Sequence, residues 1–332
     1  MLELLLDKHI EYILSFSSKK LVEYSEEQCK KLQNINWVLN ALFIIGRKDL
    51  IPINDIIDFV MLCKYEDDSI EGFGQIPFSD PHLLNTLYAV QILAICDSID
   101  RINPQKIAKY ISSLQDPETG SFKGYLWSET DVRFMYGAVC CLSIINRLDM
   151  INSEKAIEWI LKCQNCDGGF GEIPGAESHA GHGSIIGNNC FLRLKSLVFS
   201  CVATLSLFKR LDVIDVDLVC SWLSERQVLS GGLNGRPEKI EDVCYSWWVF
   251  SPLVMMNRSH WINNEYLINY ILSCQEKDSE KGGISERPKG YPDLFHTSVG
   301  IVSLSILKYP GLLELSPDYF LPVKVLQKLK NQ

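Results

Sequence analysis

The chain has 332 residues, 47% of them hydrophobic, and carries a formal net charge of −9 at pH 7. This length can form one large domain or two ordinary ones, and the hydrophobic content can support a large core. The acidic balance, with no basic run longer than two lysines, argues against a nucleic-acid-binding protein. Glu3, Asp7 and Lys8 interrupt the apolar start, so no signal peptide is expected. Apolar stretches such as residues 243–257 fall short of the roughly 20 residues that span a bilayer, so no transmembrane segment is expected.

Twelve cysteines raise the question of disulfide bonds. In a chain of this length without a secretion signal, they do not indicate a disulfide framework. Several stand in apolar helical patterns, where a free thiol packs as a small hydrophobe: Cys63, Cys140, Cys141, Cys163 and Cys274. We therefore expect a reducing, cytoplasmic location.

Helical segments of one kind recur along the chain. In the clearest copies an aromatic residue and an aliphatic neighbour stand three residues after another apolar residue, as in Ile107-x-x-Tyr110-Ile111. This spacing is one face of an α-helix. Asn103-Pro104 before that copy provides a capping side chain and a proline in the first turn. The aromatic residues stand at positions 12, 59, 110, 159, 222 and 270, which predicts six repeats of about 50 residues.

A glycine-rich turn and a second apolar helix follow most of these segments. The turns are residues 119–122, 167–170, 230–233 and 281–284, and second helices are expected at 134–145 and 298–307. Because glycine ends a helix and lets the backbone reverse, each unit is a helical hairpin. Six hairpins could stack as an open superhelix or close into a toroid. Closure is favoured because residues 243–256 are apolar nearly all round. We predict an all-α fold, a single α6–α6 barrel domain over residues 1–332, without strand-like alternation.

One interval in the repeat is 63 residues long, whereas the others are 47 to 51. About 14 extra residues fall between His182 and Ser196, and they include the basic Arg193 and Lys195. Glycine and asparagine within residues 183–190 indicate a loop. We therefore expect a loop insertion at about 182–196.

Three residues at the starts of second helices have the chemistry of metal ligands. Asp242 and Cys244 stand two residues apart, and His296 occupies the matching position in the next hairpin. Each alone is commonly structural: a helix-start aspartate, a buried cysteine or a core histidine. In a closed ring, however, both helix starts face the same end. Three ligands of O, S and N type leave one position open on zinc, which is typical of catalytic sites, and a thiol bound there would be a thiolate.

Two cations, a phenol and two indoles accompany this motif: Arg236, Lys239, Tyr245, Trp247 and Trp248. Cations in a turn are commonly just solvated. Beside Tyr245, however, Arg236 and Lys239 suit a clamp on a diphosphate leaving group, where charge develops in the transition state. His179, at the expected start of the preceding second helix, is a further candidate for this clamp. The tryptophans are expected to be partly core and partly a wall for an isoprenoid chain.

Taken together, these motifs resemble the β subunits of protein prenyltransferases, and most closely those of the Rab geranylgeranyl (type II) enzymes. The matches cover the whole chain: residues 4–9, 80–84, 89–93, 167–171, 177–181 and 231–248. The last run is highly specific, whereas the glycine turns alone are not. The resemblance implies an α6–α6 barrel with zinc held by Asp242, Cys244 and His296. It implies diphosphate contacts from His179, Arg236, Lys239 and Tyr245.

The resemblance also implies substrates and partners. Geranylgeranyl would pass from geranylgeranyl diphosphate to C-terminal cysteines of Rab GTPases, in a heterodimer with an α subunit that works with a Rab escort protein. The isoprenoid would lie in the aromatic funnel of the barrel. The expected substrate contacts also include Ala180, Gly181, Ser246, Trp247 and Trp248. Glu286, ten residues before His296, is a candidate support for Mg²⁺.

Two positions bear on the length of the isoprenoid. Leu87 is aliphatic where farnesyltransferases carry a tyrosine, which favours a 20-carbon chain. Gln33 stands where the Rab enzymes have a small residue deep in the lipid pocket. The rival enzymes are the β subunits for farnesyl and type I geranylgeranyl transfer. A non-catalytic helical-toroid scaffold would need none of the zinc and cation residues, and the lack of an Asp-x-Asp-Asp sequence disfavours a protonating terpene cyclase.

Overall fold

The computed structural model describes residues 2–17, 31–184, 193–195, 197–276 and 282–331. Its helices form six hairpins in chain order. The first helices are α1 (Leu6–Ser17), α3 (Ile53–Leu62), α5 (Pro104–Ser113), α7 (Ser153–Cys163), α9 (Val216–Ser224) and α12 (Asn264–Ser273). The second helices are α2 (Lys31–Ile45), α4 (Leu83–Ile95), α6 (Val132–Ile144), α8 (Leu197–Leu207), the pair α10 (Tyr245–Trp248) and α11 (Phe250–Met255), and α13 (Leu294–Ile306). A short 3₁₀ helix follows the second helix of each of the first five hairpins: η3 (Lys48–Leu50), η4 (Ile99–Arg101), η5 (Leu148–Met150), η6 (Leu211–Val213) and η7 (Ser259–Trp261).

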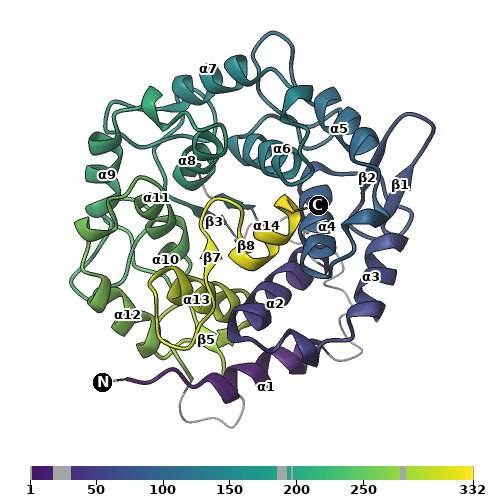
Figure 1. Cartoon of the computed structure of the whole chain (residues 1–332). Coiled ribbons are helices and arrows are strands. Elements are labelled where there is room, and N and C mark those ends of the chain that lie inside the picture. Colours follow the sequence, from purple (N-terminus) through teal and green to yellow (C-terminus); the bar gives the residue numbers. More distant parts are fainter. Residues whose placement is uncertain (1, 18–30, 185–192, 196, 277–281, 332) are drawn as a thin grey trace.

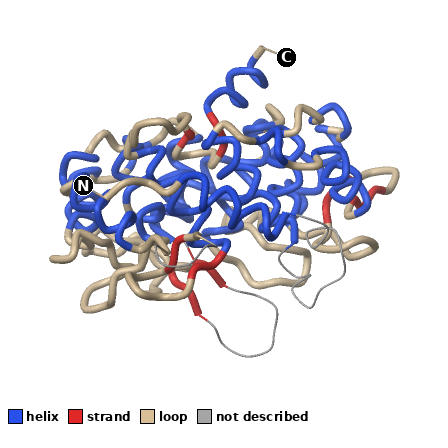
Figure 2. Tube along the Cα trace, turned by 90° about the horizontal axis from the view of Figure 1, so that it is seen from below, coloured by secondary structure: helices blue, strands red, loops and turns tan. Residues whose placement is uncertain are grey.

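The hairpins close into a toroid, with the second helices as an inner ring and the first helices as an outer ring (Figure 1). Neighbouring inner helices pack side by side from α2 through α4, α6, α8 and α10–α11 to α13, which returns against α2. The predicted α6–α6 barrel is therefore confirmed, and it is closed. The C-terminal helix α14 (Val323–Lys330) projects from one end of the ring, and the chain on either side of residues 185–192 lies at the other end (Figure 2).

The two rings differ as their sequences predict. In the outer helix α5, Ile107, Tyr110 and Ile111 are buried, and the Asn103 side chain caps the helix by accepting from the backbone N–H groups of residues 105 and 106. In the inner helix α6, 11 of the 13 residues are buried, because it packs against both neighbours, the outer ring and the interior at once. None of the described helices is long and apolar enough to cross a membrane.

Glycines after four outer helices pack against the backbone of the next outer helix: Gly120, Gly168, Gly231 and Gly282. All four have positive φ, which L side chains rarely adopt. A Cβ on Gly120 would lie 2.4 Å from the carbonyl carbon of Lys155, and one on Gly282 would lie 2.5 Å from the carbonyl oxygen of Lys8 in α1. The sharp turns predicted from glycine are therefore also the places where successive repeats touch.

The glutamine that ends several outer helices joins the repeats in the same way. The Gln115 side chain donates to the Asn152 carbonyl at 3.0 Å and accepts from the Asn152 N–H at 2.9 Å. Gln275 repeats this across the seam of the ring, donating to the Glu3 carbonyl at 3.1 Å and accepting from the Leu5 N–H at 2.9 Å. The last repeat therefore binds the first repeat through the same kind of glutamine contacts that join one repeat to the next.

The inner helix of the fifth hairpin is broken, although one helix over residues 243–256 was expected. α10 ends at Trp248 and α11 begins at Phe250. Pro252 has no N–H for the Trp248 carbonyl, and its ring crowds that carbonyl, so a regular helix cannot continue through this turn.

Four short antiparallel hairpins interrupt the helices of the described residues, although the sequence shows no strand-like alternation. They pair β1 (Lys64–Glu66) with β2 (Glu71–Phe73), β3 (His182–Ser184) with β4 (Arg193–Lys195), β5 (Ile284–Ser285) with β6 (Pro292–Asp293), and β7 (Leu315–Ser316) with β8 (Leu321–Pro322). The registers set Lys64 opposite Phe73, His182 opposite Lys195, Ile284 opposite Asp293, and Leu315 opposite Pro322. Strands of two or three residues are too short for alternation to be visible in a sequence.

Candidate active site

Capping side chains gather at one end of the toroid, because five of the hairpins hold them at the same place before the inner helix. Each accepts a hydrogen bond from a backbone N–H two or three residues ahead: His82, Asp131, His179, Asp242 and Asp293. The residue after the cap then donates to the next hairpin. Ala180 donates to the Gly235 carbonyl at 2.8 Å, and Val243 to the Glu286 carbonyl at 2.9 Å. This register brings the predicted residues of three successive hairpins together.

Asp242, Cys244 and His296 meet at this end, as the repeat predicted. Their candidate ligand atoms all lie within 4.8 Å of one another. His296 Nε2 is 3.2 Å from Asp242 Oδ1. A carboxylate oxygen, a thiol sulfur and an imidazole nitrogen at this spacing fit a zinc ion with one position left for a further ligand. The donor set is therefore chemically suited to the implied metal.

The electrostatics of the three residues also suit a cation. Burial would lower the pKa of His296, but hydrogen bonds to Asp242 and Asp293 raise it to about 10. Burial raises the pKa of Asp242, but the hydrogen bond and positive charge of His296, together with the hydrogen bonds from Cys244, outweigh this effect and leave that pKa below its ordinary value. Burial and the nearby Asp242 carboxylate raise the pKa of Cys244 well above its ordinary value. The acids thus require a positive charge, which His296 supplies when protonated and which a divalent cation could supply instead.

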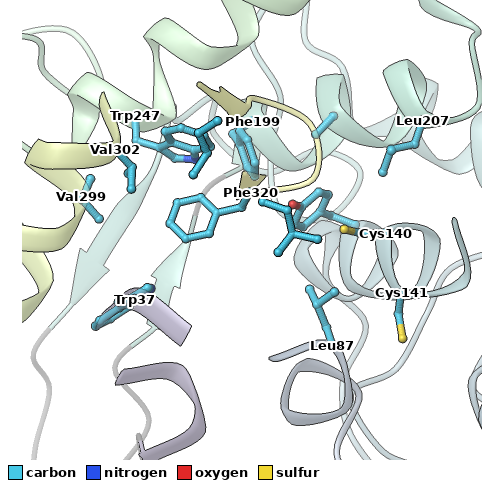
Figure 3. Close-up of a cluster of buried hydrophobic side chains, with 14 of the residues drawn as sticks. Trp37, Leu87, Cys140, Cys141, Phe199, Leu207, Trp247, Val299, Val302 and Phe320 are labelled. Atoms are coloured by element: carbon cyan, nitrogen blue, oxygen red, sulfur yellow. The ribbon is translucent and has the colours of Figure 1, made fainter. Parts of the chain in front are cut away.

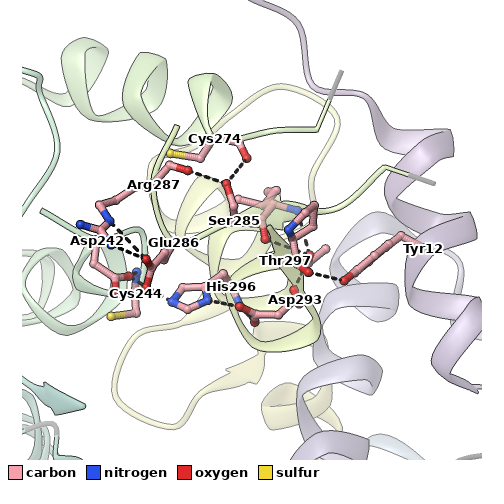
Figure 4. A network of polar contacts seen from close by, with 12 residues as sticks. Tyr12, Asp242, Cys244, Cys274, Ser285, Glu286, Arg287, Asp293, His296 and Thr297 are labelled. Atoms are coloured by element: carbon pink, nitrogen blue, oxygen red, sulfur yellow. Dashed lines mark hydrogen bonds and ion pairs between the residues drawn. The ribbon is translucent and has the colours of Figure 1, made fainter. Parts of the chain in front are cut away.

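Asp293 supports the histidine and was missed by the sequence reasoning. Its Oδ2 lies 2.5 Å from His296 Nδ1, and its Oδ1 accepts from the His296 backbone N–H at 2.9 Å (Figure 4). A bond at Nδ1 fixes the ring so that Nε2 faces Asp242 and Cys244. The signal was present in the sequence, because an aspartate three residues before the histidine is a typical helix cap.

Glu286, the candidate support for Mg²⁺, lies beside the metal ligands. Its backbone carbonyl accepts from Val243, the residue between Asp242 and Cys244. Its carboxylate, however, pairs with Arg287 through Nε at 3.2 Å and Nη2 at 2.5 Å. A role for Glu286 in holding a second metal stays a prediction.

The residues expected to bind the diphosphate lie on one loop, residues 235–241, or beside it. The His179 and Tyr245 rings are 6.3 Å apart between centroids. Arg236 binds the exposed carboxylate of Glu177, with Nη1 2.7 Å from Oε1, while its buried Nε has no hydrogen-bond partner among the described residues. Lys239 is exposed on the same loop. An anion could therefore bind both Arg236, whose Nε is buried, and the exposed Lys239.

Gly235 holds this cluster together, a role that the sequence analysis did not assign. A Cβ at this position would lie 2.4 Å from His179 Cε1 and 2.5 Å from the Tyr245 hydroxyl oxygen. Only glycine lets the backbone pass between the two rings. His179 is buried, and burial raises the pKa of Tyr245. The phenol therefore stays protonated and able to donate a hydrogen bond near neutral pH.

A central cavity opens beside these residues, with about 630 Å³ of empty space that is partly open to solvent. Aromatic residues form much of its wall, which Trp248 and Gln33 also line. Trp247 and Leu87 belong to the same wall (Figure 3). Of the expected contacts, Ala180, Gly181 and Ser246 are buried but do not line this cavity as the structure describes it.

The expected insertion interrupts the first turn of an inner helix. His179 was expected to start the second helix, but α8 is described only from Leu197. The Val198 N–H nevertheless donates to the His179 carbonyl at 3.3 Å, as Thr86 does to His82 at 2.9 Å in the second hairpin. The chain thus leaves the helix start after the cap, forms β3 and β4, and returns in register. Residues 185–192 and 196, within the expected insertion, lie outside the described residues.

Comparison with known proteins agrees with this geometry. Residues 4–321 match the family model of the prenyltransferase alpha-alpha toroid domain. The chain is 41% identical to the Geranylgeranyl transferase type-2 subunit beta of Saccharomyces cerevisiae, over 99% of this chain and 98% of that protein. It is 43% identical to the Geranylgeranyl transferase type-2 subunit beta 1 of Arabidopsis thaliana, over 99% and 96% of the two chains.

A solved structure shares the fold at lower sequence identity. Candida albicans protein geranylgeranyltransferase-I, complexed with GGPP, has a TM-score of 0.84 and 23% identity, covering 99% of this chain and 98% of that chain. The type-2 subunits are thus nearer in sequence than this type-I structure. The chain therefore belongs to the prenyltransferase α/α-toroid family, and within it to the β subunits of type-2 geranylgeranyl transferases.

Proposed function

We propose that this chain is the catalytic β subunit of a Rab-type geranylgeranyltransferase, which transfers geranylgeranyl from geranylgeranyl diphosphate to C-terminal cysteines of Rab GTPases. One observation carries the proposal. An Asp–Cys–His donor set and the loop that carries Arg236 and Lys239 meet at one end of the toroid, at the start of an aromatic-lined cavity. A toroid that served only as a scaffold would need neither the donor set nor the cations.

Zinc is the metal proposed for Asp242, Cys244 and His296. When bound there, zinc would lower the pKa of the acceptor thiol so that it reacts as a thiolate. The chain's own contribution is to orient the ligands. Asp293 holds His296 through Nδ1, and the Cys244 N–H bond to Asp242 Oδ1, at 2.7 Å, fixes the carboxylate. Mg²⁺ beside Glu286 is proposed only as a possible addition to this arrangement.

The second contribution is to stabilise the leaving group. In the proposed reaction a sulfur–carbon bond forms at C1 of the isoprenoid while the bond from C1 to the diphosphate oxygen breaks, so negative charge grows on the diphosphate. Arg236, Lys239, His179 and Tyr245 can each donate a hydrogen bond to it. Donors fixed in advance, where water is largely excluded, stabilise such charge most effectively. Binding of a diphosphate would draw Arg236 from Glu177, which is itself exposed.

The cavity would hold the isoprenoid. Its wall is rich in aromatic rings, so a branched hydrocarbon chain can be buried against apolar surface. Leu87 in this wall supports a 20-carbon chain in preference to a 15-carbon one.

An α subunit and a Rab escort protein are the proposed partners. Large apolar side chains stand exposed in the loops that lead into α4, α6, α10 and α13: Phe78, Trp127, Ile240 and Tyr291. Exposed apolar side chains grouped at one end of a protein are typical of an interface, which supports an α subunit at the end that carries the candidate site. The ten described cysteines are free thiols, which supports a cytoplasmic location for the heterodimer.

The decisive experiment compares acceptors. The chain is co-expressed with a cognate α subunit, and the zinc-loaded complex is offered geranylgeranyl or farnesyl diphosphate. We expect transfer of geranylgeranyl to full-length Rab proteins, and only with escort protein present. Efficient modification of short CaaX peptides without escort protein would instead favour a farnesyl or type I enzyme. A well-folded complex that transfers neither lipid to either acceptor would favour a scaffold.

A further inference from the structure

The C-terminal segment enters the ring of inner helices and ends the central cavity. β7 and β8 form a hairpin at the centre of the toroid (Figure 1). Its turn places Phe320 in the cavity wall, where the ring stands edge-on to Trp247 with centroids 4.8 Å apart and an interplanar angle of 89°. Figure 3 shows Phe320 pointing from this hairpin toward the interior, among Trp247, Phe199 and Leu87.

Side chains of two inner helices fix the hairpin. From α4, Gln91 Nε2 donates to the Tyr319 carbonyl at 2.8 Å. From α6, the Tyr136 hydroxyl donates to the Asp318 carbonyl at 3.0 Å, and Ser143 Oγ lies 2.7 Å from the Tyr319 hydroxyl. These bonds link Asp318 and Tyr319, the two residues before Phe320, to the barrel wall.

The backbone of Phe320 indicates that its position is imposed by these contacts. Its φ is +50°, in the left-handed region that bulky residues rarely adopt. Such a conformation persists where the surroundings determine it on several sides. The ring is therefore held in the cavity and is not simply resting on a surface.

The hairpin that carries Phe320 is anchored in the half of α4 and α6 that is remote from the candidate site, through Gln91 and Ser143. Leu84, in the first turn of α4, and Gln91, in its third, both line the cavity. Seven residues of helix rise by about 10 Å. The first turns of the inner helices are on the side of Asp242 and His296, whereas Gln91 is the residue that binds the C-terminal hairpin. The path from the site thus leads toward Phe320.

We propose that Phe320 is a specificity-determining residue that closes the isoprenoid cavity and so limits the length of the chain it accepts. The inference rests on the proposed function. A chain one isoprene unit longer would have to displace an aromatic ring packed on Trp247 and carried by a hydrogen-bonded hairpin. A shorter isoprenoid chain would leave the part of the cavity next to Phe320 empty. The hairpin therefore acts as a fixed stop in the cavity.

The test replaces Phe320 with glycine, which removes the ring and also suits a positive φ, so the backbone of the hairpin is retained. The matched control is Lys308→Gly, at another non-glycine residue with positive φ (59°) in the C-terminal part of the chain, outside the cavity wall. Heterodimers are compared with 15-, 20- and 25-carbon diphosphates in two assays: kcat/KM for transfer and equilibrium binding without acceptor. In Phe320→Gly the preference for 25 over 20 carbons should rise at least tenfold, about 1.4 kcal/mol. Lys308→Gly should match the wild type.

Two further results separate this inference from the proposed function. Phe320→Trp should shift preference toward the 15-carbon diphosphate, since a larger ring shortens the cavity. If the glycine variant does not fold, this second variant decides the matter alone. An unchanged order of chain-length preference in a folded variant would overturn the role of Phe320 while leaving transferase activity intact. A wild-type complex that binds none of the three diphosphates would overturn the proposed function itself.

Discussion

Asp293 is the residue whose replacement tests the candidate metal site most sharply. Asp293→Asn keeps a good helix cap, because the amide oxygen can still accept from the His296 backbone N–H. The amide has only one oxygen, however, so its NH₂ group then faces His296 Nδ1, where the carboxylate now lies at 2.5 Å. An N–H donor at this place favours the tautomer with a proton on Nε2, the nitrogen that must be free to bind a metal.

The expected magnitude follows from the bond that is lost. Removing the outer partner of a metal-bound histidine typically weakens metal binding by about 10- to 100-fold. Since a tenfold change corresponds to about 1.4 kcal/mol, the loss should be about 1.4 to 2.8 kcal/mol in metal-binding free energy. Because the histidine tautomer is also reversed, we expect a loss of metal-binding free energy in the upper part of that range. The helix content should be nearly unchanged because the cap is retained.

The assay is a competition titration of the heterodimer against a chelating dye of known zinc affinity, with circular dichroism as a check on folding. Asp131→Asn is the matched control, because Asp131 caps α6 from the same position of its hairpin and stands next to no metal ligand. Zinc affinity in Asp293→Asn equal to that of wild type and control would refute the idea that Asp293 orients the ligand.

Three other variants test the remaining parts of the site and the fold. Lys239→Ala should slow single-turnover transfer by roughly 10²-fold or more, since loss of one donor to a developing oxyanion costs about 2–4 kcal/mol, and a wild-type rate would exclude that role. Gly235→Ala should reduce transfer while zinc binding is kept, because the new Cβ would meet the His179 and Tyr245 rings at 2.4 and 2.5 Å; equal transfer rates would show that the loop can give way. Burial and the nearby Arg133 lower the pKa of His82 to about 4, below the roughly 6.5 of an unfolded histidine. The unfolded chain therefore takes up this proton first, so stability is full above pH 6.5 and falls by up to about 3 kcal/mol toward pH 4. Urea unfolding of His82→Asn at pH 7 and pH 5 should show a smaller loss than wild type, and the same loss in both would contradict the assignment.

The repeat made the fold predictable from the sequence. Aromatic residues such as Tyr110 and Trp222 mark one buried face in each outer helix, and the apolar inner helices have no face that could remain exposed. The closed ring was predictable because an open array would expose the apolar inner helices of its two end repeats. The metal ligands were predictable for the same reason, since Asp242 and His296 stand in equivalent positions of adjacent hairpins.

What the sequence could not provide depends on contacts between distant segments. The site of Gly235 between two rings is visible only once His179 and Tyr245 are placed. The pairing of Arg236 with Glu177 joins residues of two hairpins, and no spacing rule predicts it. Phe320 belongs to the last segment of the chain, which has no counterpart in the repeat, so the periodic pattern holds no information about where it folds.

The capping position of the hairpin explains how a structural repeat can carry a catalytic site. In the five described cases the cap is a polar side chain that satisfies free N–H groups of an inner helix, so polar side chains at one end of the toroid are favoured by the helices themselves. At His82 and Asp131, the need to cap the inner helix explains why a polar side chain stands there. At Asp242 the capping oxygen Oδ1 also lies 3.2 Å from Nε2 of His296 in the next hairpin, and at Asp293 the second oxygen lies 2.5 Å from Nδ1 of the same histidine. The candidate metal site thus arises where two neighbouring caps contact one histidine, which is why replacing Asp293 should weaken metal binding while its counterpart Asp131 should not.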